Sequence, residues 1–98
     1  MSENYIQYGE GYNKDNIDFT DIEKAIIEIQ ESDDEHGAFW VSVITDDENI
    51  IETDKNLNLA IVFEGNQSNY KAKDWLEVKE FYKLLLTENF DEIKQKIE

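Results

Sequence analysis

The stretch AFWVSVIT at residues 38–45 constrains the fold more than any other part of the chain. It is rich in aromatic and β-branched residues, which favour extended backbone, and it lacks glycine and proline. Successive side chains of a strand point to opposite faces, so Phe39 and Val41 share one face while Trp40 and Ser42 share the other. Each face carries an aromatic residue, so either can meet the core.

Helical periodicity flanks this strand on both sides. Apolar residues at helical spacing predict a helix over about 21–32, with Thr20-Asp21-Ile22-Glu23 as its capping box. Asp74 and Glu77 have the same spacing and predict the start of a helix over about 75–86. A last short helix is expected from about Asn89.

Three further strands are expected between these helices. They lie at 50–53, at 57–63 and at 70–73, and the lysines of the last one suit an edge strand. The order predicts an α+β fold with an N-terminal helix, an antiparallel meander of three to four strands, and two C-terminal helices packed on one sheet face.

The length of 98 residues favours a single domain spanning 1–98. Within it, residues 20–98 are expected to form the α+β core. Residues 1–19 show no steady period, so we expect a loosely organised N-terminal arm, with a short strand at 5–8 as its one regular element.

Acidic residues are concentrated in the first two-thirds of the chain. The net charge is −15; residues 1–64 hold 17 acids and three lysines (−14), whereas residues 65–98 hold seven acids and six lysines (−1). Such a field repels nucleic acids and anionic membranes and attracts basic proteins. We therefore expect a basic protein partner and no direct binding to nucleic acid or membrane. The plain alternatives are that the acids are solvated turn residues or reflect an acidic proteome.

Two acidic clusters, Asp33-Asp34-Glu35 and Asp46-Asp47-Glu48, flank the strand at 38–45. Carboxylates can hold Ca²⁺ or Mg²⁺, but neither cluster has the alternating ligands, the glycine and the final glutamate of an EF-hand loop. The clusters are also separated by about ten residues, on the order of 30 Å along a strand. They cannot share one ion, and we expect neither a metal nor a cofactor.

The residue types also argue against catalysis. Cysteine and arginine are absent, and His36, the only histidine, lies in an acidic turn beside Gly37. A nucleophile–histidine–acid set would have to be built around that residue, and no guanidinium is available to clamp a phosphate. We predict that the protein is not an enzyme; a small hydrolase or metal-dependent enzyme is the alternative.

The predicted partner-binding surface combines acids with one aromatic residue. Tryptophan is favoured at binding hot spots, although in so small a domain it is more often a core residue. The two acidic clusters are expected to be turns first and recognition surface second. The residues predicted to bind the partner are Asp33, Asp34, Glu35, Asp46, Asp47, Glu48, Glu52, Asp54 and Trp40.

Residues 20–98 contain, in order, the segment GAFWVSVI, an acidic turn, a short strand, LNLAIVFEG and the closing DWLEVKEFYKLLLTENFDEIKQKI. This order of elements resembles that of small immunity proteins of bacterial polymorphic-toxin systems. Such systems include contact-dependent inhibition and type VI secretion. The resemblance implies a cytoplasmic protein that binds a cognate toxin domain, often a basic nuclease, and neutralises it by covering the active site. It brings no catalytic residues with it. The N-terminus, which lacks the pattern of a secretory signal, agrees with a cytoplasmic location.

An acidic DNA mimic of the phage type is the alternative function. Such a protein would occupy the nucleic-acid channel of a defence enzyme. It predicts rows of carboxylates spaced like phosphates and several unrelated targets, whereas an immunity protein recognises one toxin family.

Overall fold

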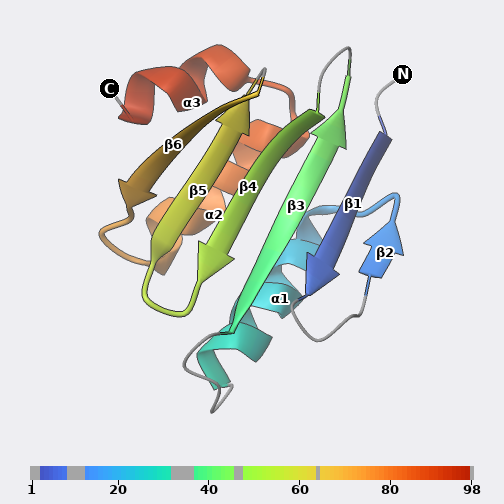
Figure 1. The fold of residues 1–98 in the computed structure, drawn as a ribbon. Coiled ribbons are helices and arrows are strands. Elements are labelled where there is room, and N and C mark those ends of the chain that lie inside the picture. The colour runs from blue at the N-terminus through green and yellow to red at the C-terminus, as the bar shows by residue number, and fades with distance from the viewer. Residues whose placement is uncertain (1–2, 9–12, 32–36, 46–47, 64, 98) are drawn as a thin grey trace.

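The computed structural model describes residues 3–8, 13–31, 37–45, 48–63 and 65–97. These residues form a six-stranded antiparallel sheet and three helices, an α+β fold as predicted (Figure 1). In chain order the elements are β1 (Glu3–Tyr8), β2 (Asn13–Asp15), α1 (Phe19–Glu31), β3 (Ala38–Ile44), β4 (Glu48–Asp54), β5 (Asn58–Phe63), β6 (Asn66–Lys71), α2 (Trp75–Leu86) and α3 (Phe90–Ile97).

The N-terminal segment belongs to the sheet, which corrects two predictions. The first element is a strand rather than a helix, and six strands replace the expected three to four. The sheet order is β2-β1-β3-β4-β5-β6; β1, which contains the short strand expected at 5–8, pairs with residues 39–44 of β3. Ile6 explains the docking, because it is only 1% exposed and lies opposite Val41 in the ladder. Burying this side chain and pairing the free edge of β3 stabilise the segment together.

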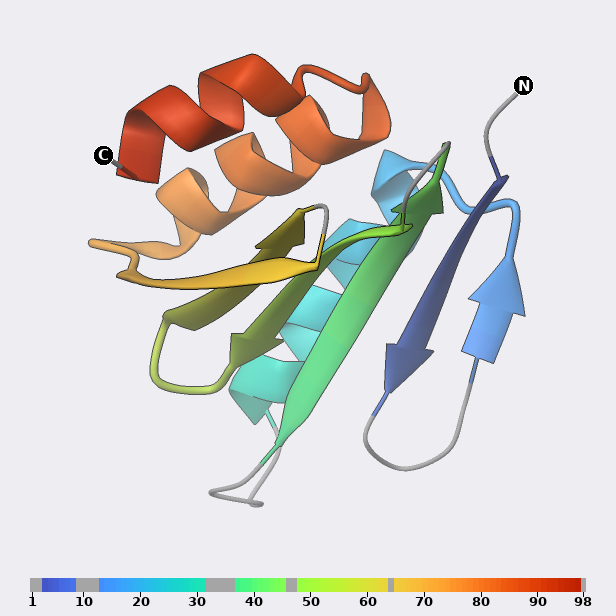
Figure 2. The same cartoon turned by 45° about the horizontal axis from the view of Figure 1, so that its top comes forward.

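The helices cover one face of the sheet and leave the other uncovered. Figures 1 and 2 show α1 and α2 side by side behind the strands, with α3 packed on α2. The helix side of the sheet and the inner sides of the helices supply the core. Its largest buried side chains are Ile6, Ile22, Ile26, Phe39, Val41, Ile51, Leu59, Ile61, Phe81, Tyr82, Leu85 and Ile93. The set of Phe39 and Val41 therefore meets the core, and the set of Trp40 and Ser42 faces away from the helices.

Side-chain caps fix where the first two helices begin. Asp74 accepts a hydrogen bond from the Glu77 amide (2.8 Å), and Glu77 accepts one from the Lys73 amide (2.9 Å), as expected for a capping pair at this spacing. The predicted cap of α1 is wrong by two residues. Asp18 and Asp21 hydrogen-bond each other's amides at 3.0 and 3.3 Å, and these residues have the same spacing as Thr20 and Glu23.

The aspartate at the start of α1 is also tied to β2. Lys14 lies 2.8 Å from the Asp21 carboxylate, and this hydrogen bond lowers the pKa of Asp21. Lys14 is the ladder partner of Ile6 and so faces the helix side. The ion pair thus helps to hold the short strand β2 against the helix.

The last strand lies earlier in the chain than predicted. It spans Asn66–Lys71 instead of the expected 70–73, so residues 66–69 are also paired with β5, and Lys73 lies beyond the strand. Gly65, at φ = 80°, permits the tight reversal between the paired residues Phe63 and Asn66. An edge strand tolerates polar side chains on both faces because no further strand or helix needs to pack on it.

A tyrosine carries the main polar contact of the core. Tyr82 is 0% exposed, stacks on Phe39 with ring centroids 5.4 Å apart, and donates a hydrogen bond to the Ile51 carbonyl oxygen at 3.1 Å. Its oxygen also shares a short hydrogen bond with the hydroxyl of Thr53, which is 0% exposed as well. The contacts fix helix α2 on strand β4 at one position, because a shift would leave buried hydroxyls without partners.

Substitution of this contact gives the first prediction. Tyr82→Phe should lower the free energy of unfolding by about 1–3 kcal/mol, because the buried Thr53 hydroxyl loses its partner. The double variant Tyr82→Phe/Thr53→Val should cost less than the sum of the two single variants. Urea denaturation measures both. Tyr5→Phe, which removes a hydroxyl from the uncovered face, is the matched control. If the costs of Tyr82→Phe and Thr53→Val simply add in the double variant, the proposed coupling between these two side chains is contradicted.

The second prediction concerns alkaline pH. Burial raises the pKa of Tyr82 far above its ordinary value near 10. The phenol is therefore protonated in the folded state at pH values where it ionises in the unfolded chain. As pH rises above about 10, this group lowers the free energy of unfolding by about 1.4 kcal/mol per pH unit. Between about pH 10 and 11.5, the free energy of unfolding should fall less steeply with pH in Tyr82→Phe than in the wild type. Equal slopes would contradict the assignment.

Candidate functional site

The uncovered side of the sheet, which we call the open face, is the surface on which most of the predicted site residues gather. Figure 1 shows α1 and α2 on the opposite side of the sheet. The strand register assigns to the open face the alternate position of each strand that does not share a side with the buried core residues. The residues of the open face are Glu3, Tyr5, Gln7, Asn13, Asp15, Ala38, Trp40, Ser42, Ile44, Glu48, Ile50, Glu52, Asp54, Asn58, Ala60, Val62, Gln67, Asn69 and Lys71.

Four of the nine predicted residues share this face. Trp40 on β3 lies directly opposite Glu52 on β4, and Glu48 and Asp54 alternate with Glu52 along the same strand. The other five predicted residues, at positions 33–35 and 46–47, lie outside the described residues. The strand register thus places carboxylates beside an aromatic side chain that is half-buried on the side away from the core.

Ladder pairs across the sheet form two adjacent rows on the open face. One row runs Tyr5, Ser42, Ile50, Val62 and Gln67, from β1 to β6. The second row runs Gln7, Trp40, Glu52, Ala60 and Asn69. The centre of the face is therefore apolar, with Trp40, Ile50 and Val62 as neighbours, and carboxylates border it.

Hydroxyl groups hold the Glu48 carboxylate at one edge of this centre. The same carboxylate oxygen accepts hydrogen bonds from Ser42 at 3.1 Å and from Tyr5 at 3.3 Å. Ser42 is 0% exposed even though it faces the open side, because Tyr5 and Ile50 flank it in the register. A carboxylate oriented in this way has lost part of its side-chain freedom before any partner arrives.

Asp54 has a structural role in the turn between β4 and β5. Its carboxylate accepts hydrogen bonds from the amides of Asn56 (2.8 Å) and Asn58 (3.0 Å), and from the Asn58 side chain (3.0 Å). The turn also places Leu57 at φ = 70°, a conformation that costs free energy for a residue with a side chain. The prediction of turns concerns the clusters at 33–35 and 46–48; of these residues Glu48 alone is described, and it belongs to strand β4 rather than to a turn.

Glu52 differs from both of these acids. Its carboxylate makes no hydrogen bond or ion pair with the other described residues, and its side chain is exposed. It lies between Trp40 on one side and Ala60 on the other. Of the described open-face carboxylates on β4, this one is the most available to a partner.

Cations are scarce on this surface. Among the described residues of the open face, Lys71 is the one cation, and its ammonium group donates to the carbonyl oxygen of Asn56. The other lysines described on β2 and on the helices lie on or toward the helix side. The five described carboxylates of the open face therefore produce a negative potential with little local compensation.

Sequence reasoning missed the contribution of β1 and of the apolar positions beside Trp40. Tyr5, Ile50 and Val62 complete the centre of the face. Alternation along each strand predicts that Trp40 and Ser42 share a side, and the same rule places Ile50 with Glu52. No local signal shows that residues 3–8 pair with β3, since the partner strand is more than 30 positions away along the chain.

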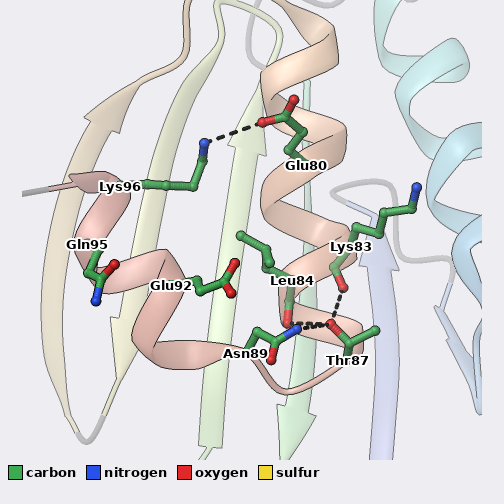
Figure 3. A pocket seen from close by; sticks show the side chains of 8 residues that line it. All are labelled: Glu80, Lys83, Leu84, Thr87, Asn89, Glu92, Gln95 and Lys96. Atoms are coloured by element: carbon green, nitrogen blue, oxygen red, sulfur yellow. Dashed lines mark hydrogen bonds and ion pairs between the residues drawn. The ribbon is translucent and has the colours of Figure 1, made fainter.

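A second concave region lies between α2 and α3 and measures about 780 Å³ (Figure 3). Lys96 bridges to Glu80 across it at 3.3 Å. At its closed end, the Thr87 hydroxyl donates to the Lys83 carbonyl oxygen at 2.8 Å and accepts from the Asn89 side chain at 2.9 Å. These bonds satisfy a carbonyl group at the end of α2 and connect the two helices. The groove is therefore a consequence of the turn between α2 and α3.

The described residues contain no candidate metal site. No group of three or more His, Asp or Glu side chains within them is close enough to hold an ion. The Tyr70 hydroxyl donates a hydrogen bond of 3.1 Å to the Glu77 carboxylate, which caps α2. Burial and this carboxylate raise the pKa of Tyr70. Nor is any described helix long and apolar enough to span a membrane.

The third prediction tests which face of β3 meets the core. Phe39→Ala should lower the free energy of unfolding by about 3–5 kcal/mol, as expected for a buried aromatic residue. Trp40→Ala, one position along, should cost less than half as much because the indole is half-buried on the open face. Urea denaturation of the two variants checks this, and equal costs would contradict the assignment.

Comparison with known proteins adds no constraint to this geometry. The chain matches no protein family, no curated protein and no solved structure.

Proposed function

We propose that the protein is an immunity-type inhibitor that binds a basic toxin domain through the open face and neutralises it by covering its active site. The observation that carries this proposal is the composition of that face. An apolar centre around Trp40 is bordered by carboxylates, and no helix covers it.

The apolar centre suits stable binding to a protein. Interface cores are enriched in aromatic residues, and a few well-packed anchors supply most of the binding free energy. Trp40, Tyr5 and Ile50 are neighbours on three adjacent strands, so one partner side chain can contact more than one of them. Trp40 is the expected hot spot.

The charge suits a basic partner that normally binds nucleic acid. A net charge of −15 attracts a positive cleft over long range and raises the association rate. At contact, Glu48 and Glu52 take the places of substrate phosphates, and bound protein then blocks access to the cleft. Such a toxin acts on nucleic acid inside the cell, and the inhibitor would act in the cytoplasm.

The arrangement of the carboxylates favours this function over DNA mimicry. A mimic needs rows of acids that follow a phosphate backbone. Here the row containing Tyr5 and Ile50 carries no acid between β1 and β6, and the neighbouring row carries Glu52 alone. An apolar surface between few acids is typical of protein recognition.

The fourth prediction concerns three forms of the protein. Wild type, a face variant (Glu48→Lys/Glu52→Lys) and a control variant (Glu28→Lys/Glu31→Lys) are used to capture proteins from nuclease-treated lysate of the source organism. The control makes the same charge change at exposed positions near the end of α1. The captured protein is identified, expressed alone, and expressed with each of the three forms.

We expect one basic protein that arrests growth when expressed alone, with growth restored by the wild type and the control but not by the face variant. Association with the face variant should be slower by about tenfold or more at low salt, and with the control by less than about threefold. Rescue by the face variant would contradict the assigned surface. Capture of several unrelated nucleic-acid enzymes, all lost at high salt, would contradict the toxin function and favour mimicry.

A further inference from the structure

The open face contains a hollow of about 470 Å³ between β4 and β6. The register explains it, because Ala60 on β5 lies between Glu52 on β4 and Asn69 on β6. A methyl group thus forms the floor between two longer side chains. Neighbouring strands are about 4.8 Å apart, so the two walls are separated by about 10 Å at the backbone.

Hydrogen-bond acceptors line both walls of the hollow. The Glu52 carboxylate has no partner among the described residues, and Asp54 follows it on the same wall with a charge that the turn amides only partly offset. On the opposite wall, the Asn69 side-chain oxygen accepts one hydrogen bond from Gln67 at 3.1 Å and retains a second lone pair. The ammonium of Lys71 at the rim is bonded to Asn56.

We propose that this hollow binds the guanidinium group of an arginine side chain that the protein partner presents. The proposal rests on the proposed function and adds the chemistry of one anchor. The hollow supplies space, Glu52 supplies the opposite charge, and the apolar floor accommodates the methylene stem.

The shape of the site favours arginine over lysine. A planar guanidinium carries five donors directed to different sides, so it can bond the Glu52 carboxylate while it also reaches the Asn69 oxygen. A compact ammonium group can satisfy one wall but not both. Guanidinium is also more weakly hydrated, so its entry into a partly enclosed hollow loses less solvation.

The test uses the full chain and three small probes at constant ionic strength: the N-acetyl, N-methylamide derivatives of arginine, lysine and citrulline. Citrulline has nearly the same shape as arginine but no charge. NMR follows the Ala60 methyl group and the Asn69 side-chain amide while each probe is raised to about 50 mM, a range suited to the weak binding of so small a ligand.

We expect the arginine derivative to shift both signals to saturation. The lysine derivative should bind at least fivefold more weakly, and the citrulline derivative should not bind. Two variants should reduce arginine binding at least fivefold: Glu52→Gln, which removes the charge, and Ala60→Val, which fills the floor. Glu3→Gln on β1 makes the same charge change on the same face and should leave binding within twofold. Shifts that never saturate, equal responses to lysine, or unchanged binding by both variants would overturn the proposal.

The outcome separates this inference from the proposed function. If the captured partner binds the open face but the arginine derivative does not occupy the hollow, the inference fails and the proposed function stands. If the hollow binds arginine yet the face variant still neutralises the captured protein, the proposed function fails at this surface.

Discussion

Every strand of this protein presents two faces, but the helices cover only one of them. Phe39 and Val41 enter the core because α1 and α2 lie on their side, and Tyr82 fixes that arrangement through its contacts with Thr53 and the Ile51 carbonyl. The same alternation then forces Trp40 onto the open face. The three helices of the described residues lie on one side of the sheet, so one-sided coverage creates both the stable core and the exposed aromatic surface.

The N-terminal strand extends this surface and protects the core beneath it. Its residue Ile6 is buried against the helix layer, while Tyr5 faces the opposite way and bonds Glu48. The pairing of β1 with β3 also moves the free edge of the sheet to the short strand β2. At the other end, β6 is a polar edge strand whose small neighbour Ala60 leaves a hollow on the open face. Both ends of the sheet thus contribute to the candidate site.

Carboxylates that look equivalent in the sequence have different physical roles. Asp18, Asp21, Asp54 and Asp74 organise helix starts or a turn through hydrogen bonds to backbone amides. Glu48 is oriented by two hydroxyl groups, and Glu52 has no hydrogen-bond or ion-pair partner among the residues that the structure describes. All of them add to the long-range negative field, but only groups without an internal partner can change their bonds cheaply when a partner binds.

The sequence by itself determined the α+β class, the positions of α1, α2 and α3 to within a few residues, and the alternation that groups Trp40 with Ser42. These features depend on local propensity, capping and periodicity, which neighbouring residues carry. The sequence also placed Glu48, Glu52 and Asp54 among the candidate recognition residues, because their charge is visible without a structure. Only the tertiary structure decided that Trp40 lies outside the core, that β1 inserts beside β3, and that Asp18 rather than Thr20 caps α1. The first two depend on contacts between distant segments. The third is a choice between two capping pairs with the same spacing, Asp18/Asp21 and Thr20/Glu23, which only the backbone path resolves.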